Sequence, residues 1–154
     1  MKTYDVTVGD DGTIEWRSEG LLHREDGPAI EFADGTKYWY LNGKRHREDG
    51  PAIEYFNGDK YWYINGKRHR DDGPAVEYVN GYKAWYRNGE RHREDGPAVE
   101  YPDGDKKWYL NGVPMTEQQH AQKTGAKKTT LIIDGKEIEM SNETIKNLKE
   151  VYGV

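Results

Sequence analysis

A phrase of seven residues, HREDGPA, occurs four times at a constant interval of 23 residues, and this repetition is the strongest constraint on the fold. The phrase begins at residues 23, 46, 69 (there as HRDDGPA) and 92. A fixed period without insertions is typical of an array in which each repeat is one supersecondary unit that stacks on its neighbours. We therefore predict a repeat array over residues 1–114, composed of a degenerate opening unit 1–22 and the units 23–45, 46–68, 69–91 and 92–114.

Each unit contains two turn signals that favour β-hairpins. The first is Asp-Gly or Asn-Gly, as at Asp34-Gly35, and the second is always Asn-Gly, as at Asn42-Gly43. Both dipeptides are typical of two-residue type I′ turns, which need positive φ at two positions. After the second turn, an extended segment such as 44–56 is bent at Gly50-Pro51, because proline lacks an amide donor. The sequence thus predicts a mainly β fold, a single-layer antiparallel sheet of stacked hairpins.

The turns also predict which side chains share a face of the sheet. With a two-residue first turn, Ile30 lies opposite Trp39 and Phe32 opposite Lys37, and the second turn places Trp39 opposite His46. One face then collects Ile30, Phe32, Trp39, Leu41 and His46, and the other Ala29, Glu31, Tyr38, Tyr40 and Arg45.

Copies of these residues form ladders along the array, and cross-strand aromatic pairs are expected to replace a thick core, because only 34% of residues are hydrophobic while 12% are aromatic. The structural ladders that we predict are Trp39, Trp62, Trp85 and Trp108, and His23, His46, His69 and His92.

Composition and charge narrow the functional classes. The absence of cysteine excludes disulfides and thiolate metal sites. The start MKTYDVTV lacks the apolar core of a signal peptide, and no apolar run is long enough to span a bilayer, so we expect a soluble, cytoplasmic protein without a transmembrane segment. The net charge of −5 is concentrated at the ends of the array: residues 1–22 carry two basic and five acidic residues, and residues 92–114 three and five. Acidic ends favour a basic partner surface.

The histidines lie within three residues of carboxylates, which is a pattern compatible with metal binding or acid–base catalysis. Equivalent histidines should, however, lie about 10 Å apart, two strand spacings, which is too far to share one metal ion. An active site is also normally unique, whereas every element here occurs four times. We therefore expect no enzyme activity, no catalytic residue, no metal and no cofactor, with a hydrolase built on His–Asp pairs as an alternative.

The positions at which the copies differ are candidates for partner recognition. Phe56, Val79 and Tyr82 place large side chains at expected exposed turns, and Arg87 replaces an aliphatic residue. Exposed apolar and aromatic clusters often mark partner surfaces, although neutral drift would also produce such variation. The predicted partner-binding set is Phe56, Val79, Tyr82 and Arg87, together with the ladder of Tyr40, Tyr63, Tyr86 and Tyr109.

The unit H-R-[ED]-D-G-P-A-[IV]-E-[FY]-x-[DN]-G-x-K-x-W-Y-x-N-G resembles the membrane occupation and recognition nexus (MORN) repeat. It is more similar to a variant form, rich in HREDGPA and WYxNGK, of bacteriophages, giant viruses and some bacteria. The resemblance covers about residues 10–114, and here eight residues separate turn glycines such as Gly35 and Gly43.

This resemblance implies an elongated sheet without catalytic activity. By analogy it suggests a non-enzymatic scaffold that binds another protein, plausibly a phage-encoded inhibitor of a host defence factor that acts in the host cytoplasm. Nucleic-acid or nucleotide binding through the aromatic ladders is an alternative, which the balanced charge of the central units disfavours. Association with phospholipid, inherited from the parent repeat, is another.

The residues after the array predict a small α/β appendage. Thr116 and Gln119 form a capping-box pattern for a short helix that ends near Gly125, within a helix and linker segment 115–128. Segment 129–154 should contain a hairpin about Asp134-Gly135 and a final helix. That helix would begin at Ser141, and its apolar stripe could support a homodimer through Ile145, Leu148 and Val151.

Overall fold

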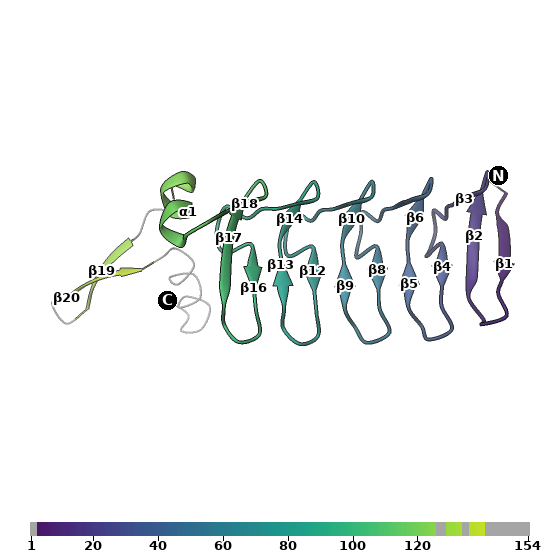
Figure 1. The fold of residues 1–154 in the computed structure, drawn as a ribbon, viewed down its shortest axis with the longest axis horizontal. Coiled ribbons are helices and arrows are strands. Elements are labelled where there is room, and N and C mark those ends of the chain that lie inside the picture. The colour runs from purple at the N-terminus through teal and green to yellow at the C-terminus, as the bar shows by residue number, and fades with distance from the viewer. Residues whose placement is uncertain (1–2, 126–128, 134–135, 141–154) are drawn as a thin grey trace.

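A computed structural model of the chain describes residues 3–125, 129–133 and 136–140. The chain forms one elongated row of hairpins, with the N-terminus at one end and a short helix at the other (Figure 1). Along one long edge lie the first turns of the units, and along the opposite edge lie the second, Asn-Gly turns (Figure 1). The predicted mainly β fold of stacked antiparallel hairpins is confirmed.

Every unit adds two strands to one continuous sheet. The first strands are β4 (Ile30–Glu31), β8 (Ile53–Glu54), β12 (Val76–Glu77) and β16 (Val99–Glu100). Their partners are β5 (Lys37–Tyr38), β9 (Lys60–Tyr61), β13 (Lys83–Ala84) and β17 (Lys106–Leu110). The opening unit supplies β1 (Asp5–Val8), β2 (Ile14–Ser18) and β3 (Leu21–Leu22), and β18 (Val113–Met115) follows the last unit. These 12 strands pair in the order β1-β2-β4-β5-β8-β9-β12-β13-β16-β17-β18, with β3 beside β2.

A smaller hairpin surrounds the second turn of the three central units. These hairpins pair β6 (Tyr40–Leu41) with β7 (Lys44–Arg45), β10 (Tyr63–Ile64) with β11 (Lys67–Arg68), and β14 (Tyr86–Arg87) with β15 (Glu90–Arg91). Backbone hydrogen bonds join one such hairpin to the next, because the Gly66 N–H donates to the Arg45 carbonyl and the Gly89 N–H to that of Arg68, both at 2.8 Å.

The two turns of a unit have different conformations, although their sequences are alike. At the second turn both Asn42 and Gly43 have positive φ, 49° and 74°, so the predicted type I′ turn is confirmed. At the first turn only Gly35 has positive φ. There the Gly35 N–H donates to the Phe32 carbonyl, the Phe32 N–H donates to the Thr36 carbonyl, and the loop has three residues. This is a type I turn followed by a glycine bulge.

The longer first turn corrects the predicted register and faces. Ile30 pairs with Tyr38 and Glu31 with Lys37, so the expected opposition of Ile30 to Trp39 and of Phe32 to Lys37 is wrong. Because one residue of shift reverses every side chain, Ile30 and Phe32 lie on the face of Tyr38 and not on that of Trp39. The pairing of Trp39 with His46 across the second turn is confirmed, since the His46 N–H donates to the Trp39 carbonyl at 3.1 Å.

The core is a row of aromatic rings on one side of the sheet, which we call the tyrosine face. Successive ring centroids are 4.9 to 5.9 Å apart along Phe32, Tyr38, Tyr55, Tyr61, Tyr78, Tyr82 and Tyr101. The row packs on the buried side chains of Ile53, Val76 and Val99. Aromatic pairs of this kind contribute about 0.5–1.5 kcal/mol each beyond the area that they bury. The sheet is therefore stabilised by contacts between neighbouring units and not by a thick interior.

Tyr82 belongs to this row and is not the exposed turn residue that we expected. The preceding units contribute Tyr38 and Tyr61, but the third unit has the fully buried Ala84 at the equivalent position. Tyr82 lies two residues earlier on the same face, and its ring centroid is 4.9 Å from that of Tyr78. It supplies the ring that position 84 lacks.

A second substitution accompanies this exchange. The residues equivalent to Tyr82 in earlier units, Thr36 and Asp59, accept hydrogen bonds from the N–H groups of Phe56 and Val79 in the following unit, at 3.2 and 2.9 Å. The residue that follows Tyr82 at this spacing is Pro102, which has no N–H. No donor is therefore left without an acceptor.

A short helix, α1 (Glu117–Thr124), ends the array. The predicted capping box is confirmed, since the Thr116 hydroxyl accepts from the Gln119 N–H, and Gly125 ends the helix with φ of 64°. His120 is buried, and its Nε2 lies 2.7 Å from the Arg93 carbonyl of the last unit. The helix thus covers an end that would otherwise lack a neighbour.

Beyond α1, β19 (Thr129–Ile133) and β20 (Lys136–Met140) form the expected hairpin. The predicted final helix, with Ser141, Ile145, Leu148 and Val151, lies outside the described residues, so a homodimer through that helix stays a prediction.

The aromatic row predicts different losses of stability when Tyr82 and Phe56, two large side chains at variable positions, are each changed to Ala. Changing Tyr82 to Ala should lower the free energy of unfolding by about 2 kcal/mol, because a half-buried ring is removed from the row. Changing Phe56, which is 70% exposed, to Ala should lower it by less than about 0.5 kcal/mol. Urea unfolding followed by circular dichroism measures both, and equal losses would contradict the assignment of Tyr82 to the core.

The hydroxyl groups of the row predict a loss of stability in alkali. Burial, followed by a hydrogen bond with Tyr55, raises the pKa of Tyr38 to about 12. Burial and a hydrogen bond with Tyr78 also raise the pKa of Tyr61. An unfolded tyrosine ionises near pH 10, so between about pH 10 and 12 the unfolded chain releases protons that the folded chain retains, and the unfolding free energy should fall as pH rises.

Replacement of both Tyr38 and Tyr61 by Phe should make this fall shallower, since Phe cannot ionise. Urea unfolding at a series of pH values measures the slope, and a slope equal to that of the unsubstituted protein would argue against the buried hydroxyls as its cause.

Candidate protein-interaction surface

The arginine of each HREDGPA phrase holds the bend of its own loop. Arg47 donates from Nε to Asp49 at 2.9 Å, and its Nη1 donates both to the Pro51 carbonyl at 3.3 Å and to the Glu54 carboxylate at 2.9 Å. A side chain on Gly50 would meet the Arg47 guanidinium carbon at 2.9 Å, so a larger residue there would displace the guanidinium from its position. The same three contacts recur around Arg24, Arg70 and Arg93.

The same guanidinium also covers a tryptophan of the preceding unit. Arg47 lies 4.2 Å from the ring centroid of Trp39, and Arg70 lies 4.1 Å from that of Trp62. Arg24 covers Trp16 and Arg93 covers Trp85 in the same way. A cation over an aromatic ring contributes about 0.5–1 kcal/mol when exposed and about 2 when desolvated.

The predicted tryptophan ladder is therefore a row of Trp–Arg pairs that recurs along the array. Among the described residues, no ring contact joins one tryptophan to another. Trp108, the last of the four, is followed at the arginine position by Thr116, and it lies beside Pro114, Met115 and Thr116 at the start of α1.

Each ladder histidine contacts the second turn of its own unit. His46 Nδ1 lies 3.1 Å from Asn65 Oδ1 and 3.2 Å from the backbone nitrogen of Asn65. His23 with Asn42, His69 with Asn88 and His92 with Asn111 repeat this arrangement. The contact orients the turn in which asparagine has positive φ, which gives each histidine a role in the fold.

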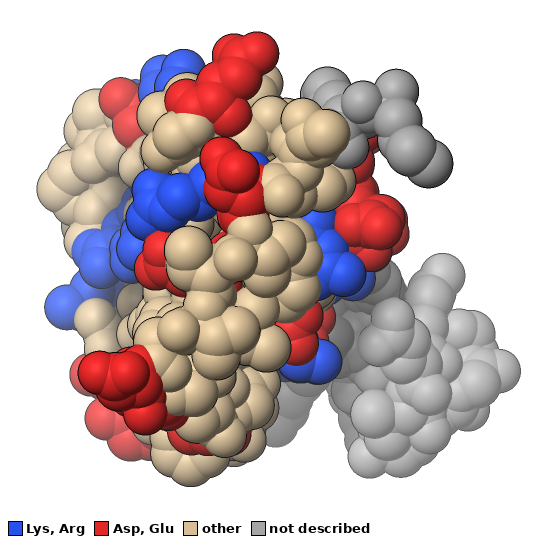
Figure 2. Space-filling model, turned by 90° about the vertical axis from the view of Figure 1, so that its right-hand side faces the viewer, with Lys and Arg blue, Asp and Glu red and all other residues tan. Residues whose placement is uncertain are grey.

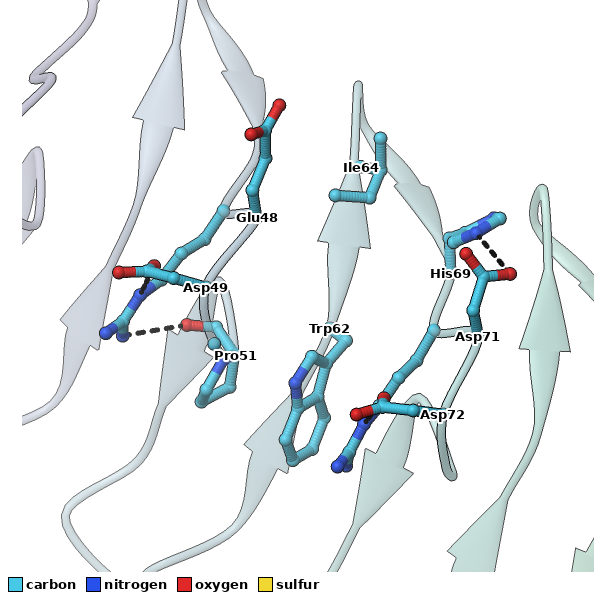
Figure 3. A pocket seen from close by; sticks show the side chains of 11 residues that line it. Glu48, Asp49, Pro51, Trp62, Ile64, His69, Asp71 and Asp72 are labelled. Atoms are coloured by element: carbon cyan, nitrogen blue, oxygen red, sulfur yellow. Dashed lines mark hydrogen bonds and ion pairs between the residues drawn. The ribbon is translucent and has the colours of Figure 1, made fainter.

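Between successive loops lies a groove on the side of the sheet that carries Trp39, His46 and Arg47, which we call the loop face. One groove has a volume of about 760 Å³, with Trp62 and Ile64 between the loops 47–51 and 69–72 (Figure 3). The next, of about 510 Å³, lies between the loops 70–74 and 92–95, with Trp85 and Arg87 in equivalent places. The array thus repeats one concave site with the period of its sequence.

Carboxylates form the rims of these grooves. Four carboxylate side chains here are 78–85% exposed: Glu48, Asp49, Asp71 and Asp72. The side chain of Arg47, in the same loop as the first two, is only 24% exposed. Hydrogen bonds from Arg47 and Arg70 lower the pKa of Asp49 and Asp72, so both carboxylates are ionised at neutral pH. Solvent therefore meets negative charge at the rim and an aromatic ring at the floor.

This polarity arises although each central unit is neutral in sequence, because folding places its charges on different faces. Arg68, in the same unit as Glu48 and Asp49, lies on the tyrosine face, where its Nε donates to the Tyr63 hydroxyl at 3.2 Å. At the N-terminal end of the array, acidic and basic side chains are interspersed over the surface (Figure 2).

No model of a known protein family matches this chain, and no curated protein matches it. The resemblance to the variant MORN repeat therefore rests on the repeated residues themselves. Within residues 3–125, 129–133 and 136–140, no helix is long and apolar enough to cross a membrane. The same residues contain no group of three or more His, Asp or Glu side chains that could hold a metal ion.

The structure separates the predicted partner-binding residues into three places. Phe56 and Val79, 70% and 67% exposed, lie at first turns of neighbouring units, and Val79 lies against Gly58 of the turn that holds Phe56. Arg87 is exposed in the second groove and forms an ion pair with Glu94 at 3.3 Å. The ladder tyrosines lie on the opposite face, buried or half-buried: Tyr40, Tyr63, Tyr86 and Tyr109. Tyr82 lies with them.

Sequence reasoning missed the set of contacts that each loop arginine makes with Asp, Pro, Glu and Trp, which we call the arginine clamp. It also missed the groove beside this clamp. The signal was the fixed spacing of Arg, Asp, Pro and Glu within HREDGPAIE, which recurs in every unit. A salt bridge alone would not need glycine and proline at constant positions, but a guanidinium that binds a carboxylate, a carbonyl and a ring does.

The clamp predicts that lysine cannot replace arginine in the loop. Changing Arg70 to Lys should lower the unfolding free energy by about 2 kcal/mol, because a single ammonium cannot reach Asp72, Pro74 and Glu77 together. The matched change of Arg87 to Lys should cost less than about 0.5 kcal/mol, since its ion pair is exposed. Urea unfolding of both variants measures the difference, and similar losses would contradict a special role for the loop arginine.

Proposed function

We propose that this protein is a non-enzymatic repeat scaffold that binds another protein, and that the grooves of the loop face provide the contact. The observation that carries the proposal is the repetition of one groove, about 760 and 510 Å³, with a tryptophan at its floor and carboxylates at its rims. Tryptophan in a concave site is typical of residues that dominate binding energy. Exposed carboxylates steer a partner of opposite charge toward it.

The partner that fits these grooves presents lysine or arginine side chains. A cationic side chain entering the first groove would lie between Glu48 and Asp71, above the pair formed by Trp62 and Arg70. Equivalent grooves at one-unit spacing allow two such side chains of one partner to bind together. Phe56 and Val79 offer apolar contacts at the turn edge of the same array, and Arg87 would contact an acidic group in the second groove.

The similarity to repeats of bacteriophages supports a host protein as the partner. In this proposal the chain acts in the host cytoplasm and blocks a surface of a host defence factor, because an elongated array covers a large area without any catalytic step. This part of the proposal rests on the resemblance of the HREDGPA and WYxNGK phrases.

Nucleic acid and phospholipid remain the alternative ligands. Stacking of bases on the ladder tyrosines needs exposed ring faces. Arg45 lies 5.5 Å from the centroid of Tyr63, Arg68 5.2 Å from that of Tyr86, and Arg91 5.2 Å from that of Tyr109. The protein's own cations thus lie over these rings, which disfavours the stacking of bases on them. Oligonucleotide binding at low salt and vesicle flotation test the two alternatives directly.

Removal of rim charge should weaken partner binding. A double variant with Glu48 changed to Gln and Asp71 to Asn should bind a basic host protein about 10-fold more weakly at low salt, because two charges that face the groove are lost. The partner is captured from a lysate of a candidate host, and its affinity is then measured by surface plasmon resonance.

The matched control changes Asp34 and Asp103 to Asn. These residues occupy the turn position at which Asn57 and Asn80 occur in the other units, so the control removes two charges without altering the turn. Unchanged affinity of the groove variant, or equal weakening in the control, would contradict the groove contact. A further variant with Phe56 and Val79 changed to Ser tests the turn edge, and full retention of affinity would exclude it.

A further inference from the structure

The two ends of the long sheet differ in how their outermost strands are protected. At the C-terminal end, β18 contains Pro114, which has no N–H, and α1 packs against β17. At the N-terminal end, β1 is outermost, all four of its residues are exposed, and no strand of the described chain pairs with its outer side. An exposed edge strand is a template for pairing with another chain, and natural proteins commonly block it.

The register of β1 on β2 identifies the open backbone groups. The Gly9 N–H donates to the Thr13 carbonyl at 2.8 Å, so the alternation of an antiparallel ladder directs the groups of Thr7 and Asp5 toward β2. The backbone groups of Val6 and Val8 therefore point outward. Their side chains are 51% and 70% exposed, which leaves apolar surface beside the unpaired donors and acceptors.

The charge of this end selects the kind of strand that fits. The opening unit carries two basic and five acidic residues, and three of the acidic ones, Asp5, Asp10 and Asp11, are exposed at or just beyond β1. Figure 2 looks onto this end and shows carboxylates at its top and lower left, with basic side chains among the carboxylates of the upper half. A second copy of the chain would bring two net negative ends together, whereas a basic strand would be attracted.

We propose that β1 binds an extended, basic segment of a partner protein, which adds a thirteenth strand to the sheet of 12. The segment pairs with the outward groups of Val6 and Val8, packs β-branched side chains against the two valines, and directs lysine or arginine toward the carboxylates nearby. This site is distinct from the grooves of the loop face and does not depend on them.

The probe that tests this is a fluorescently labelled peptide of about eight residues in which valine and lysine alternate. Fluorescence anisotropy at low salt should show binding to the full chain. The same peptide N-methylated at alternate amides, and a version with glutamate in place of lysine, should each bind at least about 10-fold more weakly, because the first lacks strand donors and the second is repelled.

On the protein side, Val6→Pro removes an outward N–H and leaves the β1–β2 hydrogen bonds in place, so it should weaken the peptide about 10-fold or more. Val8→Lys leaves the outward backbone groups of β1 in place. It should weaken peptide binding, because the new ammonium repels the lysines of the peptide. Circular dichroism verifies the fold of each variant, and the N-methylated peptide decides the matter if Val6→Pro fails to fold.

The groove variant, Glu48→Gln with Asp71→Asn, should bind the peptide as well as the unsubstituted protein does. Equal affinity of plain and N-methylated peptides would overturn the proposal. So would loss of binding in the groove variant with retention in Val8→Lys, which would place the peptide in the grooves instead and support the loop-face contact alone. Self-association that Val8→Lys abolishes, without any peptide binding, would assign the edge to a second copy and would also overturn it.

Discussion

The structure depends on one guanidinium group in each unit. Strands of two residues have too few hydrogen bonds to hold a hairpin by themselves, so each unit must be fixed by its neighbours. Arg47 does this by binding Asp49, the Pro51 carbonyl and Glu54 within its own loop while covering Trp39 of the unit before it. A planar cation with five donors can make all of these contacts at once, and no other side chain can.

The period, the β class, the second turn and the capped helix could be predicted because each depends on local sequence. Asn42-Gly43 needs positive φ at two residues, and the Thr116 capping box needs only its own first turn. The length of the first turn could not be predicted in this way, because Asp-Gly occurs both in two-residue loops and in three-residue loops with a glycine bulge. Pro102, at a position that a type I turn favours for proline, was the one residue that indicated the longer loop. A single residue of error then exchanged the two faces.

The candidate site was less accessible from sequence for a different reason. Counting charges gives a neutral unit 46–68 and hides its polarity. The fold alone decides that Arg68 bonds to Tyr63 on one face while Glu48 and Asp49 reach solvent on the other. The exposed turns of Phe56 and Val79 were foreseen, but Tyr82 was misjudged because its place in the aromatic row depends on the register of the first turn.

The bond from residue 36 or 59 to the following turn limits which unit can follow unit 69–91, where Tyr82 takes the place of the acceptor. Thr36 accepts from Phe56 and Asp59 from Val79, whereas Tyr82 is followed by a proline that has nothing to donate. The acceptor in one unit must therefore match the first turn of the next, and this match is restrictive only after Tyr82. Placing a duplicate of unit 69–91 directly after itself would set Tyr82 against the amide of Val79 with no oxygen to receive it. Units that carry Thr36 or Asp59 can precede any unit whose first turn offers an N–H, whereas a unit with Tyr82 needs a successor with proline at that place. Lengthening the array after unit 69–91 therefore requires a paired change in two adjacent units.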